Sequence, residues 1–132
     1  LKSAYESFQA GDLIKAKAAA SPHLKGIAHL AEVNYLLAFI NQEQGLQFGY
    51  QRHIEAAEAA CKGLEEEIFF KAKVSFFIGH LTEAKRLFEK APGLYGCTDK
   101  MCSCFRCEEI RKYLDELNNR LQQASAGSPH SR

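Results

Sequence analysis

One spacing limits the folds that are open to this chain: three glycines recur at a single fixed interval, and an alanine precedes each of them by seven residues. The glycines are Gly11, Gly45 and Gly79, and the alanines are Ala4, Ala38 and Ala72. A repeat of about 34 residues is typical of arrays in which each repeat is a pair of antiparallel helices joined by a tight turn. The spacing therefore predicts an all-α protein whose helix pairs stack on one another.

Apolar residues at helical spacing, separated by glycine and proline, support this interpretation. In the first segment Leu1, Ala4, Tyr5 and Phe8 fall on one helical face, and Gly11 then interrupts the pattern. A last helix lies beyond the repeats and is polar except for one apolar stripe. The expected helices cover residues 1–10, 13–20, 27–44, 50–62, 65–78, 81–91 and 107–123.

The third repeat carries the fullest motif, with Ala72 and Gly79 followed by Ala84, Phe88 and Ala91. This pattern resembles the tetratricopeptide repeat family, and the resemblance covers roughly residues 1–94. It implies a right-handed superhelix of antiparallel helix pairs, a TPR-like α-α solenoid. An irregular helical bundle with chance spacing is the alternative. The implied organisation is a helical domain over 1–123, with repeats at about 1–30, 31–64 and 65–94, a cysteine-rich loop at 95–106, a capping helix at 107–123 and a disordered tail at 124–132.

Two positions depart from the family pattern. His23 takes the last of the three second-helix positions in the first repeat, and Tyr50 stands where the second repeat should have a small alanine. A phenol does not fit a close helix crossing, so we expect the second helix of that repeat to start late or to tilt.

The resemblance also implies that the leading helix of each repeat lines a concave groove, where a protein or peptide partner would bind. Any single aromatic residue there has core packing as its alternative role. However, five of the nine phenylalanines belong to the third repeat, more than one thin layer should bury, which favours a partly exposed aromatic patch. The predicted partner-binding residues are Tyr5, Phe8, Tyr35, Phe39, Phe69, Phe70, Lys73, Phe76 and Phe77.

The best-known activity of the family is to bind the acidic C-terminal peptide of cytosolic chaperones through a clamp of basic and amide side chains. The positions matching that clamp here are Leu1, Tyr5, Leu36, Glu66 and Phe70. None of them keeps the clamp chemistry, and Glu66 would repel a carboxylate. We therefore expect an apolar or aromatic peptide segment, or a partner helix, as the ligand.

Four of the five cysteines crowd into eleven residues: Cys97, Cys102, Cys104 and Cys107. Cys104 and Cys107 have the C-x2-C spacing of zinc ligands, with His23 and His80 as substitutes if folding brings them near. Zinc binding, free thiols, and disulfide or redox use all stay open. The fifth, Cys61, fits a small core residue. This uneven distribution favours a reducing compartment, so we expect a cytoplasmic protein, with the nucleus also open.

Composition argues against several other classes. The chain has 17 Lys and Arg residues against 16 Asp and Glu residues, so it has no long-range electrostatic field that would attract nucleic acid. The alternative function is a nucleic-acid-binding accessory with a zinc-bound cysteine cluster. Its phosphate contacts would be Lys100, Arg106, Arg111 and Lys112. No run approaches the roughly 18 apolar residues that span a bilayer, so we expect no membrane partner. The motifs of common enzymes are absent from the sequence. Because the chain begins at Leu1, we expect it to be part of a longer protein.

Overall fold

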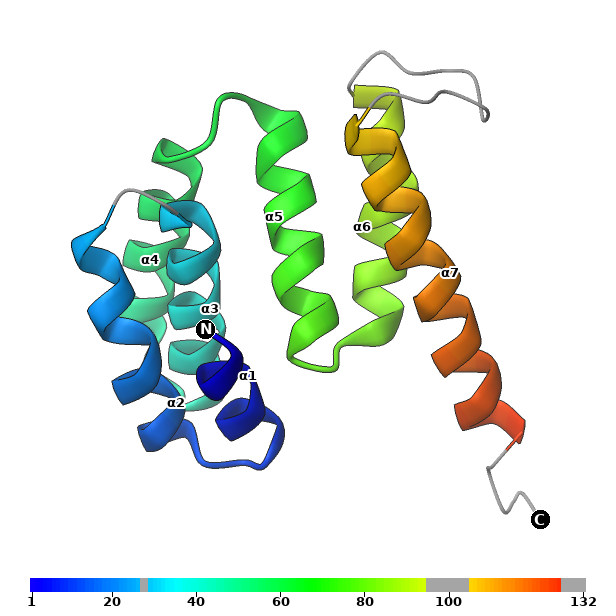
Figure 1. Cartoon of the computed structure of the whole chain (residues 1–132). Helices are drawn as coiled ribbons and strands as arrows, with labels where there is room; N and C mark the ends of the chain where they lie inside the picture. The colour runs from blue at the N-terminus through cyan, green and yellow to red at the C-terminus, as the bar shows by residue number, and fades with distance from the viewer. Residues whose placement is uncertain (27–28, 95–104, 127–132) are drawn as a thin grey trace.

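The computed structural model describes residues 1–26, 29–94 and 105–126. All regular secondary structure in these ranges is helical, as the sequence predicts. Figure 1 shows the arrangement. The helices are α1 (Lys2–Gln9), α2 (Leu13–Ala20), the short 3-10 helix η1 (Ser21–Lys25), α3 (Leu30–Glu43), α4 (Gln47–Ala59), α5 (Leu64–Phe77), α6 (Leu81–Leu94) and α7 (Phe105–Ala126).

The first six α-helices form three antiparallel pairs: α1 with α2, α3 with α4, and α5 with α6. The first helix of each pair is called its leading helix here. The leading helices end at residues 9, 43 and 77, and the second helices begin at residues 13, 47 and 81. Both series advance by the interval that separates the repeated glycines, so the helix pairs follow the spacing found in the sequence.

Each pair turns at its repeated glycine. The backbone φ angles of Gly11, Gly45 and Gly79 are 84°, 76° and 93°, in the left-handed region that a Cβ atom disfavours. In every turn, the N–H of the residue after the glycine donates to the carbonyl four residues before the glycine. These bonds measure 2.9, 2.8 and 2.8 Å. The same turn therefore joins the two helices in each of the three pairs.

The repeated alanines lie where the helices approach each other. Ala4, Ala38 and Ala72 are each 0% exposed, and Ala16 and Ala84 on the second helices are equally buried. Side chains of this size let two helix backbones pack closely.

Tyr50 does not delay α4, and the expected late start is wrong. The helix begins at Gln47, in phase with the other two pairs, and Tyr50 is a partly buried neighbour of the core. The close approach falls instead on Gly49, where an added Cβ would lie 2.6 Å from Oδ1 of Asn41. The absence of a side chain at Gly49 therefore leaves room for the Asn41 side chain.

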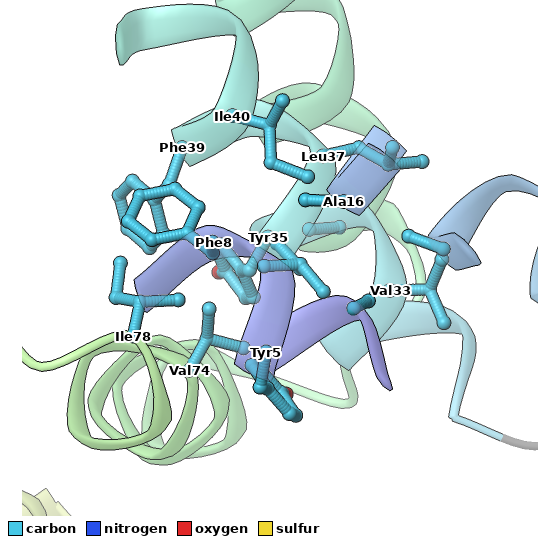
Figure 2. Close-up of a cluster of buried hydrophobic side chains, with 14 residues drawn as sticks. Tyr5, Phe8, Ala16, Val33, Tyr35, Leu37, Phe39, Ile40, Val74 and Ile78 are labelled. Atoms are coloured by element: carbon cyan, nitrogen blue, oxygen red, sulfur yellow. The ribbon is translucent and has the colours of Figure 1, made fainter. Parts of the chain in front are cut away.

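Buried side chains form two clusters. The first contains residues of helices α1, α2, α3 and α4. It also includes Val74 of α5 and Ile78, which directly follows α5, and both point toward the side of Phe8 and Phe39 (Figure 2). The second is built from α5, α6 and α7 and includes Phe69 of α5. Helix α5 therefore contributes to both clusters and connects the first two pairs to the rest of the molecule.

Helix α7 packs along α6 and covers the second cluster, in the position expected of a capping helix. It is longer than expected at both ends, and it includes residues 124–126, which the sequence analysis assigned to a disordered tail. Likewise α6 continues to Leu94, three residues past its expected end. Most of the cysteine-rich loop (residues 95–104) and the end of the tail (127–132) lie outside the described residues.

The repeated turn gives a first prediction. Replacing Gly45 by Ala should lower the free energy of unfolding by about 1 kcal/mol, because a Cβ disfavours the left-handed conformation. No atom lies within 4 Å of the added Cβ, so the backbone alone is responsible. Gly26→Ala is the matched control, since Gly26 is equally open but has an extended backbone with φ −103°. Urea unfolding followed by circular dichroism measures both; equal stability of the two variants would contradict the role of the turn.

Candidate functional site

A groove of about 670 Å³ opens between the leading helices α1, α3 and α5. Helix α1 supplies Tyr5 and Gln9, and α5 supplies Lys73 and Phe77. His29, which precedes α3, lies at the rim with its backbone in the left-handed region (φ 64°). The groove therefore lies on the side where the resemblance places a concave binding surface.

A buried carboxylate at the floor ties the three leading helices together. Glu32 of α3 is only 4% exposed. The Tyr5 hydroxyl of α1 donates a hydrogen bond to Oε2 of Glu32, and Nζ of Lys73 on α5 lies 3.0 Å from Oε1. Both carboxylate oxygens thus have a partner from a different helix pair, which offsets the cost of burying the charge.

This environment acts on the Tyr5 phenol. Burial raises its pKa well above the ordinary value of 10, and the nearby charge of Glu32 raises it further. Tyr5 consequently stays protonated and remains a hydrogen-bond donor to Glu32 across the physiological range.

Helices α1 and α5 also touch directly. The rings of Tyr5 and Phe77 stack with centroids 4.9 Å apart and an interplanar angle of 28°. The side-chain amide of Gln9 donates to the carbonyl of Phe77. These contacts fix two aromatic surfaces at one place in the groove.

One side of α5 forms a stripe that borders the groove through Lys73 and Phe77. Glu66, Phe70, Lys73 and Phe77 follow one another at alternating steps of four and three positions, which places them on one helical face, and all four are partly exposed. Phe70 lines a second hollow of about 350 Å³, and His29 borders both hollows. The α5 stripe is thus an accessible surface of alternating aromatic and charged side chains.

The predicted partner-binding residues divide into two groups. Phe70, Lys73 and Phe77 lie on the α5 stripe, and Tyr5 lines the groove although little of it is exposed. The other five are core side chains in this structure, so contact with a partner would require the helices to separate; that role stays a prediction. They are Phe8, Tyr35, Phe39, Phe69 and Phe76.

The reason for this burial in the third repeat is α7. Tyr113 of α7 stacks on Phe88 with centroids 4.8 Å apart and makes edge contacts with Phe69, Phe76 and Phe77. Its phenol is desolvated, which raises the pKa of Tyr113 to about 12. The capping helix therefore supplies the aromatic surface needed to bury most of the phenylalanines of the third repeat.

Six residues that line the groove were not placed there from the sequence: Lys2, Glu6, Gln9, His23, His29 and Glu32. Glu32 alone left a signal, because it is a carboxylate within the largely apolar helix LAEVNYLLAFI. A buried acid there requires a cation and a donor, but the sequence does not reveal which residues provide them.

The zinc prediction falls mainly outside the described residues, where Cys97, Cys102 and Cys104 lie. Cys107 is buried on α7. Within the part of the chain that is described, no three His, Cys, Asp or Glu side chains gather as a metal site. His23 borders the groove and His80 packs against Phe8, so zinc binding stays a prediction.

Cys61 packs beside the first core cluster, as expected of a small apolar side chain. Burial raises the pKa of its thiol to about 12, with further contributions from the carboxylates of Glu66, Glu67 and Glu58. The thiol is therefore protonated and poorly nucleophilic at neutral pH.

The predicted phosphate contacts are only partly described. Arg106 lies over the ring of Phe69 at 4.0 Å and pairs with Glu109 at 3.1 Å, so its guanidinium is already engaged. Lys112 is exposed, and Lys100 lies outside the described residues. Among the described helices, none is both long enough and apolar enough to cross a membrane.

Comparison with known proteins finds no match among protein-family models, curated proteins or solved structures.

The Glu32 network gives a second prediction. Lys73→Met should destabilise the protein by about 2–3 kcal/mol at pH 7, because it leaves a buried carboxylate without its cation. This is below the cost for a fully buried pair, since the Lys73 side chain is 21% exposed. Lys90→Met, at an exposed position of α6, is the control and should change stability by less than about 0.5 kcal/mol. Equal urea midpoints for the two variants would show that the ion pair does not stabilise the fold.

The raised pKa of Tyr5 gives a third prediction. Above pH 10 the unfolded chain loses the Tyr5 proton while the folded protein keeps it, so the free energy of unfolding falls as pH rises. Tyr5→Phe removes this contribution. The stability advantage of the unmodified protein over the variant should therefore shrink between pH 10 and pH 11.5, by at most about 1.4 kcal/mol per pH unit. Urea titrations of both proteins across this range measure the gap; a constant gap would contradict the assignment.

Proposed function

We propose that this protein is an interaction module that binds a peptide segment or a partner helix in the groove between α1, α3 and α5. The groove volume of about 670 Å³ and the stacked rings of Tyr5 and Phe77 are the observations that carry the proposal. Fixed aromatic surfaces beside a hollow are typical anchors in protein interfaces.

The helix pairs support assignment to a tetratricopeptide-repeat-like solenoid with a right-handed superhelix. Their ends advance by one constant interval and their turns share one hydrogen bond, as expected of stacked equivalent repeats. In such an array the leading helices line the concave side, where partners bind. The uneven distribution of cysteines is consistent with a cytoplasmic setting.

The ligand we propose is apolar or aromatic rather than an acidic chaperone tail. Of the positions matching the chaperone clamp, Leu36 is fully buried and the Tyr5 hydroxyl is engaged by Glu32. Phe70 and Glu66 offer no cation to a carboxylate. The α5 stripe instead presents two aromatic rings on either side of Lys73.

The surroundings of the residues predicted to contact phosphate favour peptide binding over nucleic-acid binding. The Arg106 guanidinium is stacked and paired within the molecule. With a net charge of +1, the whole chain also offers little attraction for phosphate.

A blocking variant tests the groove. Selection from a random peptide library displayed on phage yields peptides that bind the protein. Glu6→Trp then places an indole at an exposed position of the groove wall, and it should weaken their binding about tenfold or more. Glu89→Trp makes the same change at an exposed position of α6 and should not affect binding. Fluorescence anisotropy measures affinity, and circular dichroism checks that both variants stay helical.

The binding position has an independent readout. Amide chemical-shift changes on adding a selected peptide should concentrate on α1 and α5. Changes confined to α2, α4 and α6, or equal peptide affinities of the two tryptophan variants, would overturn the groove assignment.

A further inference from the structure

The ionisable side chains of the groove balance one another. Lys2 and Lys73 each carry a positive charge, and Glu6 and Glu32 each carry a negative charge. With the histidines counted as neutral, the formal charges of the lining side chains sum to zero. The four are not equivalent, however. Lys2 and Glu6 are exposed, where solvent and salt screen their charges, whereas Glu32 is buried and Lys73 is largely covered.

Of the two lysines that line the groove, Lys73 is the less screened by solvent, and it lies on the α5 stripe between Phe70 and Phe77. Its ammonium is already compensated by Oε1 of Glu32 at 3.0 Å. The other oxygen of Glu32 accepts from Tyr5, so both oxygens are engaged and the carboxylate is held in place. An acidic ligand would have to bind Lys73 against the fixed negative charge of Glu32.

We infer that Glu32 determines the selectivity of the groove: it neutralises Lys73 and so makes the groove reject acidic segments and accept uncharged ones that carry an aromatic or apolar anchor. This inference rests on the proposed function. It assigns Glu32 a role beyond stability, as the residue that distinguishes this groove from an anion-binding one. Repulsion between like charges is stronger where solvent screens it poorly. The buried carboxylate of Glu32 therefore repels an acidic ligand more strongly than the exposed carboxylate of Glu6 does.

Replacing Glu32 by Gln tests this role. The amide is nearly isosteric and can still accept from the Tyr5 hydroxyl, but it leaves the Lys73 ammonium uncompensated. The probes are two fluorescein-labelled peptides: the tightest uncharged peptide selected by the unmodified protein, and the same peptide with Glu at a position flanking its aromatic anchor. The measured quantity is the ratio of their dissociation constants, which a general loss of stability would not change.

The unmodified protein should bind the uncharged peptide about tenfold more tightly than the acidic one. In Glu32→Gln this preference should disappear or reverse. The double variant Glu32→Gln/Lys73→Gln should lose the gain in acidic-peptide binding, because the freed ammonium is absent. Glu89→Gln removes the same charge from an exposed position of α6 and should keep the preference.

The outcomes separate the two proposals. An unmodified protein that selects acidic peptides, or a preference that stays the same in a folded Glu32→Gln, overturns the role of Glu32 and leaves the groove as a binding site. If the folded protein selects no peptide from the library, the proposed function is rejected and the inference with it. Should Glu32→Gln fail to fold, selection of acidic peptides by the unmodified protein would still overturn the inference, and selection of uncharged peptides would support it.

Discussion

The glycine turn is the constraint on which the rest of the structure depends. A helix commonly ends in a tight turn through one backbone position in the left-handed conformation, and glycine adopts that conformation at the lowest cost. Here the turn occurs at Gly11, Gly45 and Gly79 with the same hydrogen bond each time. Because the three turns are alike, each second helix starts at the same distance from its glycine. The three leading helices then lie side by side and can share a groove.

That arrangement explains why a charged residue can be buried in the middle of the molecule. Glu32 lies on the central leading helix, so helices on both sides can reach it: α1 supplies the Tyr5 hydroxyl and α5 supplies the Lys73 ammonium. The Glu32 network stabilises the helix stack through polar contacts, whereas the two buried clusters stabilise it through apolar contacts. It also leaves the charge at the groove floor compensated within the molecule.

The sequence predicted the elements well and the contacts between them poorly. Spacing determined the helix pairs because the turn is a local property of a few adjacent residues. It misjudged Tyr50, because α4 begins at Gln47 and the Tyr50 ring is accommodated beside the first cluster. It placed Phe69 and Phe76 in the groove because their contact with Tyr113 joins residues far apart in the chain. The Glu32–Lys73 pair joins helices of different repeats and was equally hidden.

Helix α5 shows how one helix can hold the molecule together and also keep one side accessible. Val74 enters the first cluster, Phe69 and Phe76 enter the second, and the stripe that includes Lys73 borders the groove. A helix that is apolar on several sides must be packed on several sides. Any ligand on the stripe therefore contacts the helix that joins the two clusters. Binding there would favour the state in which α1 and α5 touch, so a partner that fits the groove should also stabilise the fold.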